Sequence, residues 1–240
     1  MATAFELKQE IVKYSHLLHA RGWVANHDGN VSARLPRNAG FLITPTAISK
    51  RDAKPDGIAA VTPAGEPTGK QKPPSEVALH VGAYLARPEI GAVLHAHPPE
   101  ASAFALAGRA IAPIAMPEVV VSLGASIPLV PLFLPKDPQA TAAVQAALQG
   151  ADVALLAGNG VIAVGADLEQ AYLRLELIEH YARILGRALS LGAPPAALSG
   201  EALETLVSMR KKAGFVVPKG ESGLRAVVAD EVRRALGRKS

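Results

Sequence analysis

The sequence predicts a single α/β domain of mixed short strands and helices, followed by a basic C-terminal extension. Hydrophobic residues make up 49% of the 240 residues and charged residues 19%, which is typical of a globular protein with a substantial core. Apolar runs of strand length, bounded by glycine and proline, are interspersed with segments of helical periodicity. No internal repeat and no clear linker precedes residue 190, so we assign residues 1–215 to the domain and 216–240 to the extension.

The first half of the chain combines one long helix, several short strands and a second helix. Apolar side chains recur every three or four positions over residues 4–21, which predicts a helix that Gly22 closes. Ser75 is a good N-cap for a second helix that runs to about Arg87. Prolines and glycines make residues 63–74 a loop. The predicted strands are residues 31–35, 41–44, 57–62 and the apolar run that begins at Ala92.

The second half continues with short strands and contains the longest helix. Asp167 and Gln170, three residues apart, resemble a capping box and open that helix. The tight turn Gly158–Gly160 joins two apolar strands. The other predicted helices are residues 100–106, 138–148, about 200–212 and a stretch near 222–236. The predicted strands are residues 111–115, 127–134, 153–157 and 161–164.

Composition excludes several classes of protein. The absence of cysteine rules out disulfides, thiolate metal sites and a cysteine nucleophile. Charged side chains within an amphipathic pattern distinguish residues 1–20 from a secretory signal. No apolar run reaches the roughly 18 residues that a membrane span requires. We therefore expect a cytoplasmic protein without a membrane partner.

The positive charge is concentrated at the C-terminus. The formal net charge is +4, but residues 209–240 alone carry nine lysines and arginines against three acidic residues. The first 208 residues therefore sum to −2. Aromatic side chains do not alternate with these basic residues, so the pattern favours a solvated helix or a subunit contact over nucleic-acid binding.

Two histidines in the stretch 92–98 are the strongest sign of a functional site. His95 and His97 are two residues apart, so on a strand both imidazoles leave the same face. Two neutral imidazoles can hold one divalent metal, which then needs one or two further ligands. Pro98 ends the strand and places the pair at its carboxyl end. The alternative is a pair of histidines packed or hydrogen-bonded in the core.

Four other segments place polar groups in turns, at strand ends or at a helix N-terminus. Gly29 and Asn30 offer backbone N–H groups and a side-chain amide suited to an anion such as phosphate. Thr46 places a hydroxyl at the end of a strand, and Ser75 and Glu76 place a hydroxyl and a carboxylate where helix N–H groups also attract anions. The fourth segment is the glycine turn between the two apolar strands. Each segment taken alone favours ordinary turn or cap chemistry over a binding site.

In this order, these segments and the histidine pair resemble the class II aldolase/adducin family, which includes enzymes such as fuculose-phosphate aldolase and ribulose-phosphate epimerase. The matching segments are residues 29–32, 42–46, 72–76, 95–97 and 155–160. The resemblance extends over residues 5–215. Five motifs in a fixed order are far more specific than two histidines alone.

The resemblance implies a three-layer α/β/α fold with a mixed, mostly antiparallel central sheet. Many members of the family are tetramers with active sites at subunit interfaces, so we expect a homotetramer. Its enzymes cleave or epimerise sugar phosphates, or decarboxylate related acids, through a metal-bound enediolate. The implied activity is that of a metal-dependent, aldolase-type lyase on a small phosphorylated or carboxylated hydroxy-carbonyl substrate. Zinc is the favoured cofactor, with manganese or cobalt as alternatives.

The resemblance also implies roles for individual residues. His95 and His97 match two metal ligands. Glu76 matches the carboxylate that serves as general base, or as an extra ligand when substrate is absent. The residues that match the phosphate-binding positions are Gly29, Asn30, Thr46 and Ser75.

The chain departs from the family pattern at several places, among them the third metal ligand and the acid tyrosine. Asn159 stands where the family has its third histidine ligand, and an amide oxygen suits harder ions better than zinc. His80 is a remote substitute for that histidine. The aldolases' acid tyrosine is missing from its segment, in which Glu118 is a candidate proton donor. The metal ligands that we predict are His95, His97, Glu76 and Asn159.

These departures leave a second hypothesis open. The chain could keep the fold as a non-catalytic, adducin-like binding or assembly module that has lost the third histidine ligand. The presence of His95, His97 and Glu76 together favours the enzyme, because a module without chemistry needs none of the three.

Overall fold

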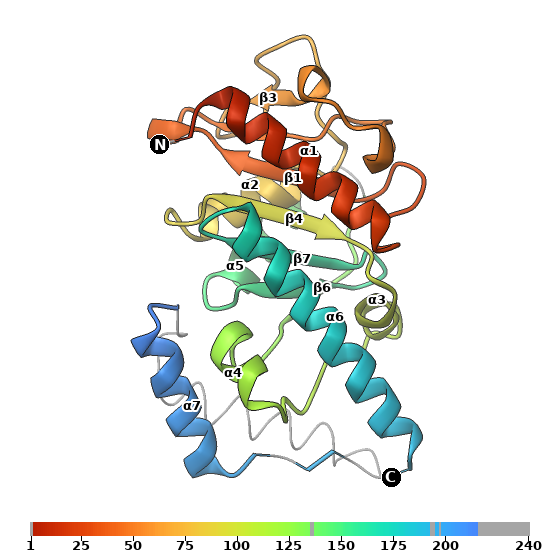
Figure 1. The fold of residues 1–240 in the computed structure, drawn as a ribbon, viewed down its shortest axis with the longest axis vertical. Helices are drawn as coiled ribbons and strands as arrows, with labels where there is room; N and C mark the ends of the chain where they lie inside the picture. The colour runs from red at the N-terminus through yellow and green to blue at the C-terminus, as the bar shows by residue number, and fades with distance from the viewer. Residues whose placement is uncertain (1, 135–136, 193–194, 197, 216–240) are drawn as a thin grey trace.

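A seven-stranded sheet forms the middle layer of the described part of the chain (Figure 1). The computed structural model describes residues 2–134, 137–192, 195–196 and 198–215. The strand order is β3-β2-β1-β4-β7-β6-β5, and every neighbouring pair is antiparallel except β5 and β6. The strands are β1 (Asn30–Arg34), β2 (Phe41–Ile43), β3 (Ala59–Val61), β4 (Ala92–Ala96), β5 (Leu129–Val130), β6 (Val153–Leu156) and β7 (Val161–Gly165).

Helices cover both faces of this sheet, which confirms the predicted three-layer α/β/α fold with a mixed, mostly antiparallel sheet. One core cluster joins the sheet to α1, α3 and α6, and a second joins its other face to α2 and α5 (Figure 1). The helices are α1 (Ala4–Ala20), α2 (Val77–Ala86), α3 (Pro99–Leu106), α4 (Pro117–Leu123), α5 (Pro138–Leu148), α6 (Leu168–Ser190) and α7 (Gly200–Lys212).

Strand β4 lies at the centre of the sheet, between β1 and β7. Its side chains alternate between the two core clusters: Leu94 belongs to the cluster with α1 and α6, and Val93 to the cluster with α2 and α5. The same alternation turns His95 toward the α2 face. The register pairs His95 with Asn30 on one side and with Ile162 on the other, so β1 and β7 flank the histidine.

Two sequence predictions fail between the third and fifth helices. Residues 111–115 form no strand, because Pro113 lacks an N–H and the Tyr181 hydroxyl bonds the backbone there, accepting from Ala115 N at 2.9 Å. The strand predicted at 127–134 shrinks to Leu129–Val130. Helix α4 was not predicted, since its valine run has strand propensity. It forms because the helix buries Val119 and Val120 against the α6 side of the core.

The two predicted helix caps have different outcomes. Asp167 caps α6 as predicted, and its Oδ1 accepts from Gln170 N at 2.8 Å, while the Gln170 side chain accepts from Ala166 N at 2.9 Å. The prediction that Ser75 caps α2 is wrong. Helix α2 begins at Val77, with Glu76 in the N-cap position and no side-chain cap bond, because the Glu76 carboxylate turns toward other partners described below.

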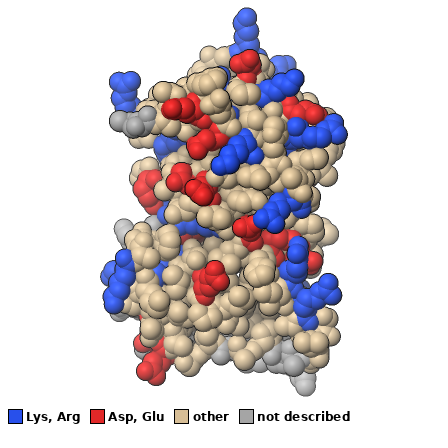
Figure 2. Space-filling model, in the orientation of Figure 1, with Lys and Arg blue, Asp and Glu red and all other residues tan. Residues whose placement is uncertain are grey.

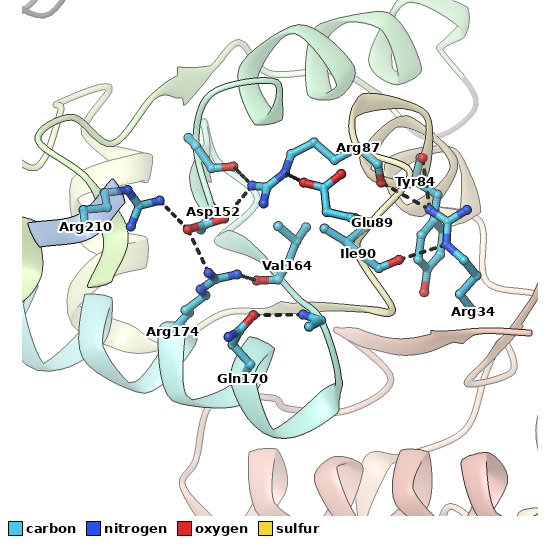
Figure 3. Close-up of polar contacts among 12 residues, drawn as sticks. Arg34, Tyr84, Arg87, Glu89, Ile90, Asp152, Val164, Gln170, Arg174 and Arg210 are labelled. Atoms are coloured by element: carbon cyan, nitrogen blue, oxygen red, sulfur yellow. Dashed lines mark hydrogen bonds and ion pairs between the residues drawn. The ribbon is translucent and has the colours of Figure 1, made fainter. Parts of the chain in front are cut away.

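A buried charge cluster lies at the edge where β6 begins (Figure 3). The Asp152 carboxylate is fully buried and accepts from three arginines. Arg87 follows α2 and reaches Oδ1 at 2.5 Å, whereas Arg174 of α6 and Arg210 of α7 reach Oδ2 at 2.9 and 2.5 Å. Four segments that are far apart in sequence are thus held to one carboxylate. We call these four residues the Asp152 cluster.

Charges of both signs are interspersed on the face that carries α1 and α6 (Figure 2). Among the described residues, no helix is both long and apolar enough to cross a membrane. The basic extension 216–240, with its predicted helix near 222–236, lies outside the described residues. The division of the chain at residue 215 therefore stays a prediction.

Candidate functional site

The central strand brings the two histidines of the sequence motif together. His95 is on β4 and is fully buried, and His97 follows the strand with its backbone N–H bonded to Trp23 O at 2.8 Å. Their ring centroids are 5.1 Å apart and the rings meet edge to face. The two imidazoles therefore lie on one side of the sheet, as the spacing predicted.

The oxygen atoms that face Nδ1 of each ring leave the two Nε2 atoms available. His95 Nδ1 lies 3.0 Å from Val161 O, and a carbonyl only accepts, so Nδ1 carries the hydrogen and a neutral ring has its lone pair on Nε2. His97 Nδ1 lies 3.5 Å from Asp28 Oδ2. Both Nε2 atoms are buried without a hydrogen-bond partner among the described residues. Histidines that bind a metal are commonly arranged in this way, with the other nitrogen held by an oxygen.

Glu76 completes the group from the start of α2. Its Oε2 lies 3.5 Å from His95 Nε2 and 3.3 Å from Asn30 Nδ2, and its Oε1 accepts from Asn159 Nδ2 at 2.8 Å. Burial alone would raise the pKa of Glu76, but His95 and the two amides outweigh burial and hold that pKa below its ordinary range. Glu76 is therefore a carboxylate at neutral pH.

The space between Glu76 and His95 fits a cation. A carboxylate oxygen and a neutral imidazole nitrogen 3.5 Å apart would direct lone pairs at each other, so a proton or a metal ion between them is needed. Two imidazoles and one carboxylate form a donor set that zinc and other transition metals accept. Among the described residues, however, no three or more His, Asp or Glu side chains form, in the arrangement seen, a group that could hold a metal ion.

Asn159 lies in the turn between β6 and β7, where it was predicted. The turn closes through Leu156, whose O accepts from Asn159 N at 2.8 Å and whose N donates to Gly160 O at 2.8 Å. The amide nitrogen of Asn159 is engaged by Glu76, which leaves its Oδ1 as the atom that could face a metal. Its role as a ligand stays a prediction.

Two glycines allow loops to approach the histidine strand closely. Gly160 has φ +70°, and a Cβ there would lie 2.4 Å from Ala96 O and 2.6 Å from His97 Cδ2. Gly29 has φ +67°, and a Cβ would lie 2.9 Å from His95 O. Any larger residue at either position would push a loop away from a histidine.

The residues predicted to hold an anion are only partly brought together. Asn30 is 3% exposed and both of its amide atoms are engaged, by Glu76 and by His80. Thr46 and Ser75 are exposed, and the backbone of Thr46 bonds Lys72 O at 3.1 Å, which brings the two loops together. Their role in binding phosphate stays a prediction.

A small pocket opens beside Glu76 and Asn159. Its volume is about 190 Å³, and apart from these two residues its lining is mostly apolar. The apolar lining residues are Leu79, Leu132, Phe133, Leu134, Ala78 and Ala140. A carboxylate and an amide at the edge of an apolar pocket are the kind of lining that small-molecule sites have, although this pocket is smaller than most.

Two charged residues near the site were not singled out from the sequence as functional. Asp28, interpreted there only as a turn residue, faces His97. Lys50 is 2% exposed and donates to His27 O and Ile48 O, each at 3.2 Å. Burial lowers the pKa of Lys50 to about 8. No local pattern marks Lys50, because its burial depends on how two loops meet.

Two other candidates from the sequence do not lie at this site within one chain. His80 cannot replace the third histidine ligand, because Ser32 Oγ lies 2.7 Å from its Nδ1 and Asn30 Oδ1 lies 3.0 Å from its Nε2. Glu118 lies on α4 and lines a cleft of about 1030 Å³ along α6, whereas Glu76 lines the separate small pocket. Within one chain, Glu118 is therefore no proton donor for that pocket.

Comparison with known proteins agrees with this geometry. Residues 9–185 match the family model of the Class II Aldolase and Adducin N-terminal domain. A 5-methylthioribulose-1-phosphate/5-deoxyribulose-1-phosphate aldolase of Escherichia coli O45:K1 is 32% identical over 165 residues, which cover 69% of this chain and 76% of the relative. A 3-oxo-tetronate 4-phosphate decarboxylase of Cupriavidus necator is 31% identical over 188 residues, which cover 77% of this chain and 85% of the relative.

A solved structure of an aldolase has the same fold as this chain. The structure of an L-fuculose 1-phosphate aldolase superposes with a TM-score of 0.80 and 25% sequence identity. The match covers 90% of this chain and 99% of that one.

Proposed function

Because the chain belongs to the Class II Aldolase and Adducin N-terminal domain family, we propose that it is a metal-dependent lyase acting on a small phosphorylated or carboxylated hydroxy-carbonyl compound. The relatives described above are an aldolase and a decarboxylase of phosphorylated substrates. Both kinds of reaction break a carbon–carbon bond and leave an electron pair on a carbon next to a carbonyl. One site can therefore support either reaction.

A single observation carries the proposal. A carboxylate and two buried imidazole nitrogens lie together, and the nitrogens have no hydrogen-bond partner among the described residues. A buried polar atom without a partner costs about 1–3 kcal/mol, so a protein that only needed the fold would gain stability by replacing these side chains. This supports the enzyme over a non-catalytic adducin-like module.

The residues that would hold the metal are His95 and His97 through Nε2, with Glu76 or Asn159 as a further ligand. When bound, a divalent ion would supply Lewis-acid polarisation of the substrate's carbonyl and hydroxyl oxygens. Zinc is our first choice, and the oxygen ligands would also accept manganese or cobalt.

Glu76 is the proposed general base. His95 and the two amide partners keep it ionised, and a carboxylate at the edge of an apolar pocket can take a proton from a substrate hydroxyl or from a carbon next to a carbonyl. We propose that the anionic end of the substrate is held by the Gly29 backbone and by the Asn30, Thr46 and Ser75 side chains.

We also propose a homotetramer that acts in the cytoplasm in carbohydrate metabolism. Its partner would be the small anionic substrate, without nucleic acid or membrane. These proposals rest on the family resemblance alone.

The first test is the metal content of the purified protein by elemental analysis. We expect one divalent ion per chain, and its loss in a His95→Ala/His97→Ala variant. A His19→Ala/His180→Ala variant is the matched control, because it removes two exposed histidines and should keep the metal. Absence of metal after incubation with zinc, manganese and cobalt would overturn the proposal. A metal-loaded protein should then cleave or decarboxylate a phosphorylated ketose or 3-oxo acid.

A further inference from the structure

A chain of buried hydrogen bonds runs behind Glu76 and involves residues that have no role so far. Tyr84 OH lies 2.9 Å from Ser32 Oγ, which lies 2.7 Å from His80 Nδ1. On the other side of the ring, His80 Nε2 lies 3.0 Å from Asn30 Oδ1. Asn30 Nδ2 then donates to Glu76 Oε2 at 3.3 Å. The chain alternates between strand β1 and helix α2.

The Glu76 carboxylate fixes the direction of every bond in this chain. An ionised carboxylate only accepts, so Asn30 must turn its Nδ2 to Glu76 and its Oδ1 to His80. Asn30 Oδ1 also only accepts, so the hydrogen of His80 is on Nε2. A neutral His80 then accepts at Nδ1 from the Ser32 hydroxyl, which in turn accepts from Tyr84.

The ionisation states that this direction requires agree with the surroundings. His80 is fully buried, and burial together with nearby His95 lowers its pKa to about 3, so the ring is neutral. Burial raises the pKa of Tyr84, which keeps its hydrogen. The Arg34 guanidinium lies 4.5 Å from the centre of the Tyr84 ring and donates to Tyr84 O at 3.1 Å (Figure 3). These contacts hold Tyr84, the residue at the far end of the series of hydrogen bonds, in place.

We propose that His80 is a positioning residue that acts through Asn30: its Nε2–H holds the Asn30 amide with Nδ2 toward Glu76, which keeps the carboxylate turned to His95. Ser32 and Tyr84 accommodate this tautomer, because the Ser32 hydroxyl can donate to His80 Nδ1 while it accepts from Tyr84. A flipped Asn30 amide would direct Oδ1 at the carboxylate and N–H groups at the His80 N–H, and both contacts are repulsive. Asn30 is 3% exposed, so water cannot compensate.

The proposal rests on the proposed function, because it assumes that Glu76 and His95 form the reactive site. It can nevertheless be tested without any reaction. Nitrogen-15 NMR of histidine-labelled whole protein reports the tautomer of each ring. We expect His80 to be the neutral Nε2–H tautomer from about pH 5.5 to about pH 8. A hydrogen on Nδ1, or a charged ring within that range, would overturn the proposal whether or not the protein binds metal.

A thermodynamic cycle on zinc binding then tests whether His80 acts through Asn30. We expect His80→Leu and Asn30→Ala each to weaken zinc binding about tenfold, which is the size seen for residues that orient metal ligands. The double variant should bind no more weakly than Asn30→Ala, because His80 has nothing left to hold. Losses that multiply in the double variant would show that His80 acts by another route.

Two conservative variants separate positioning from general damage to the core. His80→Gln keeps an N–H₂ group near the position of Nε2 and should restore most of the zinc affinity lost in His80→Leu. Tyr84→Phe keeps the ring and removes only the hydroxyl, so it should lower thermal stability with little effect on zinc binding. Loss of zinc binding in His80→Gln as large as in His80→Leu would contradict the proposal. If the wild type binds no metal, the proposed function fails, and the NMR result alone decides on the chain of hydrogen bonds.

Discussion

Strand β6 connects two buried polar clusters of opposite character. At its start, the Asp152 cluster pairs one carboxylate with three guanidinium groups, and each carboxylate oxygen has a charged partner (Figure 3). At its end, where the chain turns into β7, Asn159 meets Glu76 beside the two histidines. There, His95 Nε2 and His97 Nε2 have no hydrogen-bond partner among the described residues.

This difference in pairing indicates that the Asp152 cluster stabilises the fold, whereas the histidine cluster is arranged for binding. The Asp152 cluster joins the end of α2 and the start of β6 to α6 and α7, so its contacts hold elements together. The histidine cluster is preorganised: Val161 O holds one ring, and Asn30 and Asn159 hold the carboxylate. A site that keeps strong ligands unpaired gives up stability for binding. Substitutions in the two clusters should therefore affect different measurements.

The largest effect is expected from Asp152→Asn. The substitution leaves three buried arginines around a neutral side chain, and breaking a buried pair in this way costs about 3–5 kcal/mol. Chemical denaturation should show this loss in the free energy of unfolding. Asp56→Asn, at an exposed aspartate, is the matched control and should change stability by less than about 0.5 kcal/mol.

The same variant also tests the separation between the clusters. Folded Asp152→Asn protein should bind zinc with the affinity of the wild type, because the two clusters share no contact at the described side chains. Weakened zinc binding in protein that is still folded would show that the clusters are coupled.

The next largest effect is expected from adding metal. Zinc at about 100 times its dissociation constant should raise the free energy of unfolding of the wild type by about 2.7 kcal/mol. The His95→Ala/His97→Ala variant should show no such gain. Thermal unfolding with and without zinc measures both. An equal gain in the double variant would place the metal elsewhere in the protein.

A smaller effect is expected from Gly160→Ala, which acts on the histidine cluster through the backbone. The residue has φ +70°, and the added Cβ would lie 2.4 Å from Ala96 O, so we expect a loss of about 1–3 kcal/mol together with weaker zinc binding. Gly186→Ala is the control, because that helical glycine has no heavy atom within 4 Å of an added Cβ, and it should gain up to about 1 kcal/mol. Unchanged zinc affinity in Gly160→Ala would argue against close control of His97 by this turn.

Much of the fold was predictable because it depends on local patterns. Helices α1, α5 and α7 and most strands follow from periodicity and from proline and glycine boundaries. Helix α4 was not predictable in this way, because its valines favour a strand and only packing against distant helices makes it helical. The strand predicted at 111–115 failed for the related reason that Tyr181, far along the chain, bonds its backbone.

The site was predictable as far as motifs reach. His95, His97, Glu76 and Asn159 were named from the sequence, and the structure brings them together. The Asp152 cluster and the partners of His80 were not, because each depends on side chains from separate elements that meet only in the folded chain. His80 in particular has the spacing of a helix neighbour of Glu76 but bonds Ser32 and Asn30 on the sheet instead.

The smallest effect is expected from pH, and it again distinguishes the two clusters. The pKa of His80 in the folded protein is about 3, against 6.5 for an unperturbed histidine, mainly because the ring is buried. Below about pH 6.5 the unfolded chain therefore binds a proton that the folded chain does not, and stability falls as pH falls, by about 1 kcal/mol per unit. Between about pH 7 and about pH 5.5 in the presence of a chelator, His80→Gln should lose stability less steeply than the wild type. Asp152→Asn leaves His80 and its surroundings in place, so this variant should lose stability as steeply as the wild type. Equal slopes for His80→Gln and the wild type would mean that His80 does not stay neutral in the folded protein, and the direction assigned to its hydrogen bonds would then be wrong.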